Sequence, residues 1–262
     1  MDNSLPVYSD MQSDHKQQAL RDFVADVSHE LRSPLTSIKG FAQAILDGTA
    51  KDKKAQLKAA SVIEDEAKRV IRLVDELLEL SRMESGQIQM AQGPVDTEEL
   101  LQHCHEIFMM RAEEKDLQMA ADIKPLSPVI GDIDRLEQVF SNLLDNALKH
   151  IPAGGKISIA AQQPSADFIE ITVSDTSPGI PPEQLPHVFK RFYRVDTSAA
   201  KTGIGLGLAI ARKIVRAHGG DIKVNSILGE GTEFIVRLPV NVNISREWMP
   251  EPRRYSCSRL SL

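Results

Sequence analysis

Residues 20–45 read LRDFVADVSHELRSPLTSIKGFAQAI and decide the first half of the fold. Apolar residues recur in this stretch in steps of four and three, at Leu20, Val24, Val27, Leu31, Pro34, Ile38, Phe41 and Ile45. Such alternating steps are the heptad pattern of helices that pack in a bundle. Gly48 ends this pattern, and Asp52 or a neighbouring residue begins the next helix.

A second heptad seam follows, and Ser85-Gly86 closes its helix. Its members are Ala60, Ile63, Ala67, Val70, Val74 and Leu77. Two helices of about 30 residues joined by a short loop form a helical hairpin. Because one hairpin cannot surround its own seam, burial favours a homodimer in which two hairpins make a four-helix bundle. A helical spacer without chemistry is the alternative.

The C-terminal half predicts a different architecture. We expect helices over residues 97–114, 133–150 and 205–217, extended chain over 125–129, and strands over 156–161, 168–174, 221–226 and 232–238. Because helices and strands are segregated rather than strictly alternating, the pattern favours an α+β two-layer sandwich with helices on one face of a sheet. The predicted order is a flexible leader over 1–17, the hairpin over 18–86, a linker over 87–95, the sandwich over 96–241 and a disordered tail over 242–262.

The composition excludes several classes of function. The net charge of -6 provides no basic field for nucleic acid or an anionic membrane. No apolar run approaches the roughly 20 residues that span a bilayer, and the N-terminus lacks the regions of a signal peptide. Cys104 and Cys257 have no metal-type spacing and are expected to be reduced thiols.

His29 occupies the outermost position of the first heptad seam, so we expect its side chain to face solvent. Pro34 follows about one turn later, removes a backbone donor and should bend or loosen the helix. Placing a helix breaker beside an exposed histidine costs stability, which suggests a use for the histidine. A solvated histidine without function is the alternative.

Four segments of the C-terminal half carry polar or glycine-rich motifs. Residues 135–150, RLEQVFSNLLDNALKH, place two Asn and a Lys on one helix face, which suits Mg²⁺ and phosphate. Residues 173–182, VSDTSPGIPP, put an Asp at a strand end before a turn. Residues 202–211, TGIGLGLAIA, form a glycine-rich helix start of the kind that cradles phosphate. Residues 229–232 read GEGT. Each motif alone is weak.

Residues 23–38, FVADVSHELRSPLTSI, resemble the phosphoacceptor box of sensor histidine kinases. The four C-terminal motifs, in their order, resemble the ATP-binding domain shared by histidine kinases, gyrase-type topoisomerases and heat-shock chaperone ATPases. The resemblance covers residues 18–240. It implies a homodimeric protein-histidine kinase of a two-component system that uses ATP and Mg²⁺ and passes its phosphoryl group to an Asp of a response regulator receiver domain. It also implies a cytoplasmic location, including as the cytoplasmic part of a membrane-bound sensor.

The resemblance assigns roles within the phosphoacceptor box. It makes His29 the nucleophile that takes the phosphoryl group and Glu30 the general base. Ser33, one turn after His29, stands where the family usually has Thr or Asn and would position water for dephosphorylating the regulator. Serine keeps the hydroxyl and lacks the methyl group of threonine.

In the second domain the resemblance implies contacts to each part of MgATP. Asn146, helped by Asn142, would hold Mg²⁺. The expected phosphate contacts are Lys149, His150, Tyr193, Arg194, Gly203, Gly205, Leu206, Gly207 and Leu208, with Arg194 offsetting charge in the transition state. The expected adenine pocket comprises Asp175, Gly179, Ile180 and Thr232. Residues 187–201 resemble a lid anchored by Phe189 and Phe192.

Two other functions remain possible from the sequence. A chaperone- or topoisomerase-type ATPase places a Glu four residues before the Asn that holds the metal, whereas this chain has Asn142, which cannot act as a base. A dimeric signalling scaffold with a weakened nucleotide site is supported only by Ser177. A related serine kinase lacks the helical hairpin and ranks below both.

Ser177 replaces the first Gly of the family pattern Asp-x-Gly-x-Gly. Glycine is used there because the backbone must run close to the adenine or because φ is positive, and serine adds a Cβ and a hydroxyl. If φ is unfavourable, the strain costs on the order of 1–2 kcal/mol, roughly tenfold in affinity. We therefore expect the variant Ser177→Gly to bind ATP more tightly than the unaltered chain, as measured by calorimetric titration. An unchanged affinity would refute the strain at this residue.

Overall fold

The structure is a computed structural model that describes residues 6–87, 90–195 and 204–240, with side chains from Arg21 onward apart from Asp22. The chain divides into two compact units between Glu79 and Leu80, and each unit is described by itself. None of the described helices is both long enough and apolar enough to cross a membrane.

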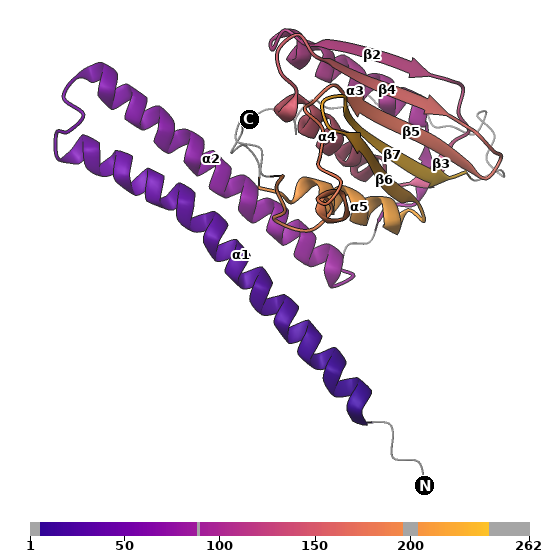
Figure 1. Cartoon of the computed structure of the whole chain (residues 1–262), viewed down its shortest axis with the longest axis horizontal. Coiled ribbons are helices and arrows are strands. Elements are labelled where there is room, and N and C mark those ends of the chain that lie inside the picture. Colours follow the sequence, from indigo (N-terminus) through magenta and orange to yellow (C-terminus); the bar gives the residue numbers. More distant parts are fainter. Residues whose placement is uncertain (1–5, 88–89, 196–203, 241–262) are drawn as a thin grey trace. The chain divides into compact units, whose positions relative to one another are not determined.

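The first unit is the predicted helical hairpin, formed by α1 (Pro6–Leu46) and the greater part of α2 (Lys53–Glu84) (Figure 1). Gly48, with φ of 75°, lies in the connecting loop. The Asp52 carboxylate accepts the amide of Ala55 at 2.7 Å and so caps the start of α2. The predicted break at Gly48 and the new start near Asp52 are both confirmed.

The predicted flexible leader is wrong for residues 6–17, because α1 begins at Pro6. Proline suits a first helical turn, since its ring fixes φ and its missing N–H is one that has no partner within the helix. The prediction relied on apolar periodicity, which these residues lack. A helix can form without an apolar stripe, so the lack of periodicity did not exclude one here. The predicted tail, 242–262, lies outside the described residues.

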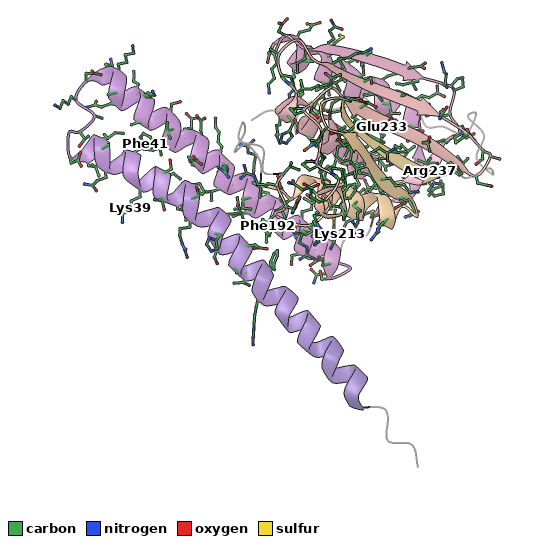
Figure 2. The ribbon with its side chains drawn as sticks, viewed as in Figure 1. Lys39, Phe41, Phe192, Lys213, Glu233 and Arg237 are labelled. Atoms are coloured by element: carbon green, nitrogen blue, oxygen red, sulfur yellow. The ribbon has the colours of Figure 1, made fainter. Side chains whose placement is uncertain are left out.

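The heptad seams are only partly covered within one hairpin. Val24 is 55% exposed and Val74 41% exposed, and the other seam residues with described side chains range from buried to exposed. Figure 2 labels Phe41 on α1, another seam residue, which is 38% exposed. Incomplete burial of this kind is what a hairpin shows when its seam needs a second surface.

The second unit is the predicted two-layer sandwich. Its sheet has the strand order β2–β4–β5–β7–β6, and helices α3, α4 and α5 lie against it (Figure 1). The bounds are β2 (Gln118–Ile123), β4 (Lys156–Gln162), β5 (Phe168–Asp175), β7 (Gly231–Pro239), β6 (Asp221–Ile227), α3 (Thr97–Glu113), α4 (Ile133–His150) and α5 (Gly207–Ala217). β2 pairs parallel with β4, and the other pairs are antiparallel.

Part of the predicted linker belongs to the second unit. β1 (Gly93–Val95) pairs antiparallel with β3 (Val129–Gly131), and the amide of Ala91 donates to the Asp132 carboxylate at 3.0 Å. The prediction of a linker over 87–95 is therefore wrong from Ala91 onward. The Gly-Pro pair suggested a break in the chain, but both residues fit an edge strand of a two-stranded ribbon.

Strict alternation on the central strands places apolar side chains toward the helices. On β5, Ile169, Ile171 and Val173 are buried, and the same alternation brings Asp175 to the buried face at the end of the strand. The outer face is polar: Arg237, labelled on β7 in Figure 2, contacts Glu170 at 2.7 Å. The sheet thus presents a buried polar group only at one end of its helix-facing side.

Candidate functional site

The first part of the candidate site lies on α1, where His29 is exposed as predicted. The helix continues through Pro34, whose ring is buried. Because proline has no N–H, the carbonyl of Glu30 lacks the amide that a regular helix would provide. Ser33 is exposed and lies four residues after His29, so both side chains face the same side of the helix.

Glu30 differs from its neighbour, because its side chain is only 25% exposed and approaches α2. Its Oε2 lies 3.6 Å from the guanidinium of Arg69. The sequence motif drew attention to Glu30 but not to Arg69. No local pattern identifies Arg69, because its relation to Glu30 arises only when the two helices pack.

The second part of the site lies in the second unit, where three adjacent strands end together. Asp175 on β5 pairs directly with Thr232 on β7, and Thr232 pairs with Ser226 on β6. The Ser226 and Thr232 hydroxyl oxygens are 3.0 Å apart. Asp175 and Thr232 are 7% and 5% exposed, so two polar side chains stand side by side at the edge of the apolar core.

Ser226 also fixes the turn after β5, although the sequence did not single it out. Its hydroxyl donates to the carbonyl of Gly231 at 2.6 Å and accepts the amide of Ile180 at 2.8 Å. These bonds join the 176–180 turn to the β6–β7 hairpin. Only the cross-strand register reveals this role, because Ser226 lies within an ordinary strand sequence.

Ser177 does not have the predicted strain. Among the described non-glycine residues only Asp116 and Phe192 have positive φ, so the predicted backbone strain at Ser177 is wrong. The expected gain on Ser177→Gly then depends only on the added Cβ and hydroxyl lying close to a bound adenine. The amide of Ser177 donates to the Asp175 carboxylate at 2.9 Å. Its hydroxyl lies 3.3 Å from that of Thr232. Serine therefore fits this turn.

Gly179 and Gly231 allow two backbone segments to approach closely. A Cβ on Gly179, whose φ is +79°, would lie 2.3 Å from the carbonyl oxygen of Ile227. A Cβ on Gly231 would lie 2.0 Å from the carbonyl oxygen of Asp175. Real side chains do not tolerate such distances, so these two close backbone approaches require glycine at both positions.

The glycine-rich segment forms the start of α5, as predicted, although the helix begins at Gly207 rather than Gly205. Gly205 has φ of +77°, and its carbonyl accepts the amide of Phe192 at 2.9 Å. Leu206 is fully buried and Leu208 half-buried. Gly203 lies outside the described residues. The first amides of α5 have no acceptors within the helix and suit an anion.

Asn142 ties the polar face of α4 to this glycine-rich start. Its side-chain amide donates to the carbonyl of Gly207 at 3.1 Å. Asn146, one turn further along α4, is half-buried, and Lys149 is exposed. The helix that carries the amides and the helix that begins with glycine therefore meet at one point.

His150 ends α4 close to charged groups from three segments. Burial lowers the pKa of its imidazole, Lys149 and Arg194 lower that pKa further, and Asp175 opposes them. The protonation state of this imidazole can change, because a nearby anion would raise its pKa and favour the charged form. The predicted residues Asp175, Lys149, His150 and Arg194 thus form one electrostatic neighbourhood.

The segment before the undescribed residues 196–203 is anchored by aromatic contacts. Phe189 packs edge-on against Phe234 of β7, with ring centroids 6.2 Å apart. Tyr193 lies against His187, with centroids 5.6 Å apart. Phe192 has φ of 58° and bonds to Gly205 through its backbone. Phe189 thus anchors the segment to the sheet through its ring, whereas Phe192 anchors it to the start of α5 through its amide.

Burial raises the pKa of the Cys104 thiol to about 12, which keeps this group protonated. Cys104 is a buried free thiol, as expected of a reduced cysteine. Cys257 lies outside the described residues.

A helical hairpin with an exposed His29 and a partly buried Glu30 precedes a two-layer sandwich with buried polar side chains at one end of its sheet. This combination is typical of the two domains of a histidine kinase core. Residues 19–86 match the family model described as His Kinase A (phospho-acceptor) domain. Residues 131–242 match the model described as Histidine kinase-, DNA gyrase B-, and HSP90-like ATPase. The chain belongs to the sensor histidine kinase family.

Known proteins resemble both units. The sensor protein SrrB of Staphylococcus aureus (strain N315) is 37% identical over 233 residues, which are 88% of this chain and 40% of SrrB. The chain therefore spans less than half the length of this relative. The mycobacterial sensor histidine kinase MprB is 34% identical with a TM-score of 0.52, covering 56% of this chain and 97% of that one. Histidine kinase ThkA, solved in complex with the response regulator TrrA, is 25% identical with a TM-score of 0.70, covering 92% and 68%.

Replacing Gly179 with alanine tests the close approach beside Asp175. The change adds both a positive-φ cost of about 1–2 kcal/mol and a clash with Ile227, for a total of about 3 kcal/mol in the free energy of unfolding. Gly154→Ala is the matched control, because Gly154 has φ of +78° and nothing within 4 Å of its added Cβ. Urea denaturation followed by circular dichroism measures both. Equal losses in the two variants would show that the approach to Ile227 has no energetic weight.

Proposed function

We propose that this chain is an ATP-dependent protein-histidine kinase that autophosphorylates His29 and transfers the phosphoryl group to an Asp of a response regulator. The observation that carries the proposal is the exposed His29 followed by a carboxylate that is held against the second helix. The nucleotide-type pocket of the second unit supports a phosphate donor in the same chain. A simple hydrolase is disfavoured because Asn142 has no basic group and is engaged with Gly207.

In the proposed reaction a ring nitrogen of His29 attacks the γ-phosphorus of ATP. An N–P bond forms, the bond from the γ-phosphorus to the bridging oxygen breaks, and ADP leaves. Glu30 accepts the proton from the imidazole as general base. Ser33, one turn away on the same face, would position water when the regulator is dephosphorylated.

Adenine would bind beside Asp175, whose carboxylate accepts the exocyclic amino group. Thr232 and Ile180 line the same pocket, and Gly179 leaves room for the base. The shared strand ends and the Ser226 bonds to Ile180 and Gly231 support this assignment. A rigid pocket of this kind limits the entropy lost when the nucleotide binds.

The phosphates would lie at the start of α5. Their proposed contacts are Gly203, Gly205, Leu206, Gly207, Leu208, Lys149, His150, Tyr193 and Arg194. Cationic side chains and helix amides neutralise the charge that spreads over the phosphoryl oxygens during transfer. Arg194 acts on that charge in the transition state.

Mg²⁺ fits the donor set only together with nucleotide. Among the described residues no three His, Cys, Asp or Glu side chains gather into a metal site. Asn142 donates its amide NH₂ to Gly207, which leaves its oxygen for a cation, and Asn146 provides a second amide oxygen. Mg²⁺ would neutralise phosphate charge there, with the phosphates completing its oxygen ligands.

The proposed partners are a second copy of the chain and a receiver domain. Incomplete burial of the heptad seams supports a four-helix bundle of two hairpins. The regulator would dock near His29, since its Asp must reach the phosphorylated imidazole. We place this activity in the cytoplasm, where ATP is available.

Incubation with γ-labelled ATP and Mg²⁺ tests the proposal directly. The unaltered chain is expected to acquire label that is labile in acid and stable in alkali, as expected for phosphohistidine. His29→Ala removes the acceptor nitrogen and is expected to abolish the label. His103→Gln, a change of another histidine on α3, is expected to label normally. Label that persists in His29→Ala, or a chain that takes up no label, would refute the proposal.

The His150 imidazole provides a test of the phosphate site. In the free protein its pKa lies below the ordinary value of 6.5, mainly because of burial. Bound MgADP brings negative charge near the ring, so we expect the pKa to rise and nucleotide affinity to increase as pH falls through this range. NMR titration of the ring protons with and without MgADP measures the shift, with His103 as the internal reference. An unchanged His150 titration would exclude this residue from the phosphate site.

A further inference from the structure

Arg69 on α2 stands between two carboxylates within the first unit. Its NH2 lies 3.6 Å from Oε2 of Glu30 on α1, and its NH1 lies 3.9 Å from Oε2 of Glu66, one turn earlier on α2. The three side chains are 24–25% exposed. One guanidinium thus serves two partly buried acids, and each acid faces a different nitrogen.

Glu66 lies where an apolar residue would be expected. Ala59 and Leu73, seven residues before and after it, are 4% and 1% exposed. The Oε2 atom of Glu66 is buried and has no hydrogen bond among the described residues. A carboxylate with a buried oxygen lowers stability unless a charge compensates it, and Arg69 is the compensating charge. Because burying this carboxylate oxygen lowers the stability of the hairpin, a purely structural role does not explain why the residue is a glutamate.

We propose that Arg69, oriented by Glu66, is a positioning residue that holds the Glu30 carboxylate in place beside His29. The inference rests on the proposed function, in which Glu30 is the general base. A glutamate has three rotatable side-chain bonds, and an untethered Glu30 would spend most of its time away from the imidazole. Arg69 attracts Oε2 and thereby restricts the carboxylate, so that the other oxygen can meet the ring N–H.

The planar guanidinium suits this task better than an ammonium group. Its two terminal nitrogens face two carboxylates in a fixed relation, so the orientation of Glu66 on α2 determines where Glu30 is held. Lysine offers a single point charge on a flexible stem and cannot relate two acids in this way. Arg69→Lys therefore keeps the charge but loses the fixed geometry.

The first measurement is the rate of autophosphorylation with MgATP in the full chain. Arg69→Gln is expected to lower kcat by about tenfold to a hundredfold with an unchanged KM for ATP, because ATP binds in the other unit. Arg69→Lys is expected to restore only part of the loss. Arg72→Gln, an exposed arginine one turn further along α2, is the matched control and is expected to keep the kcat of the unaltered chain.

Two double variants separate positioning from folding. Arg69→Gln leaves Glu66 uncompensated, so Arg69→Gln/Glu66→Gln should regain the melting temperature while kcat stays low. In the Glu30→Gln background, Arg69→Gln should change kcat by less than about twofold, because the group through which it acts is already gone.

The outcomes distinguish the possible failures. If the unaltered chain takes up no label, the proposed function itself fails. If it labels normally but the losses from Glu30→Gln and Arg69→Gln multiply independently, Arg69 does not act through Glu30 and the inference is wrong. Recovery of kcat together with melting temperature in Arg69→Gln/Glu66→Gln would likewise overturn it, since the role would then be structural.

Discussion

The cross-strand pairing of Asp175 with Thr232 is the constraint on which the second unit depends. It places two polar side chains at the one end of the sheet where the apolar face stops, and it brings Ser226 into the same row. The adjoining turns then pass so close to the backbone of Ile227 and Asp175 that positions 179 and 231 can hold only glycine. This register therefore produces the group of polar side chains at which we propose that adenine binds.

A second constraint holds together the elements that are proposed to bind the phosphates. The bond from Asn142 to the Gly207 carbonyl holds α4 to the start of α5, so the amide face and the free helix amides stay together. Phe192 bonds to Gly205 and ties a third segment to the same place. The Phe192–Gly205 bond uses only backbone atoms and so tolerates change in the surrounding side chains, whereas the bond to Gly207 requires the side-chain amide of Asn142.

The sequence predicts most elements of both units because their periodicity is strong: α4 and the central strands alternate clearly between apolar and polar residues. It misses β2 and the β1–β3 ribbon, which are short or half-exposed strands recognisable mainly from their partners. In the site, glycine and Asp motifs identify Gly179, Gly205 and Asp175, whereas Ser226 and Arg69 depend on contacts between distant segments. The assumed strain at Ser177 was wrong because a family pattern shows which residue is usual, not which φ is present.

In the proposed reaction the hairpin holds the acceptor and its base, whereas the sandwich holds the nucleotide. Asn142 stands where the sequence comparison with chaperone-type ATPases expects a carboxylate base, so nucleotide bound as proposed would meet no base there to activate water. The proposed base, Glu30, belongs instead to the hairpin, and its surroundings contain an acid with a buried oxygen and a shared guanidinium that a simple spacer would not need. Placing the proposed base and the proposed nucleotide site on different units would keep bound ATP apart from a base that could activate water. It also means that the orientation of Glu30 is set within the hairpin, where a change in helix packing can alter it without touching the nucleotide pocket.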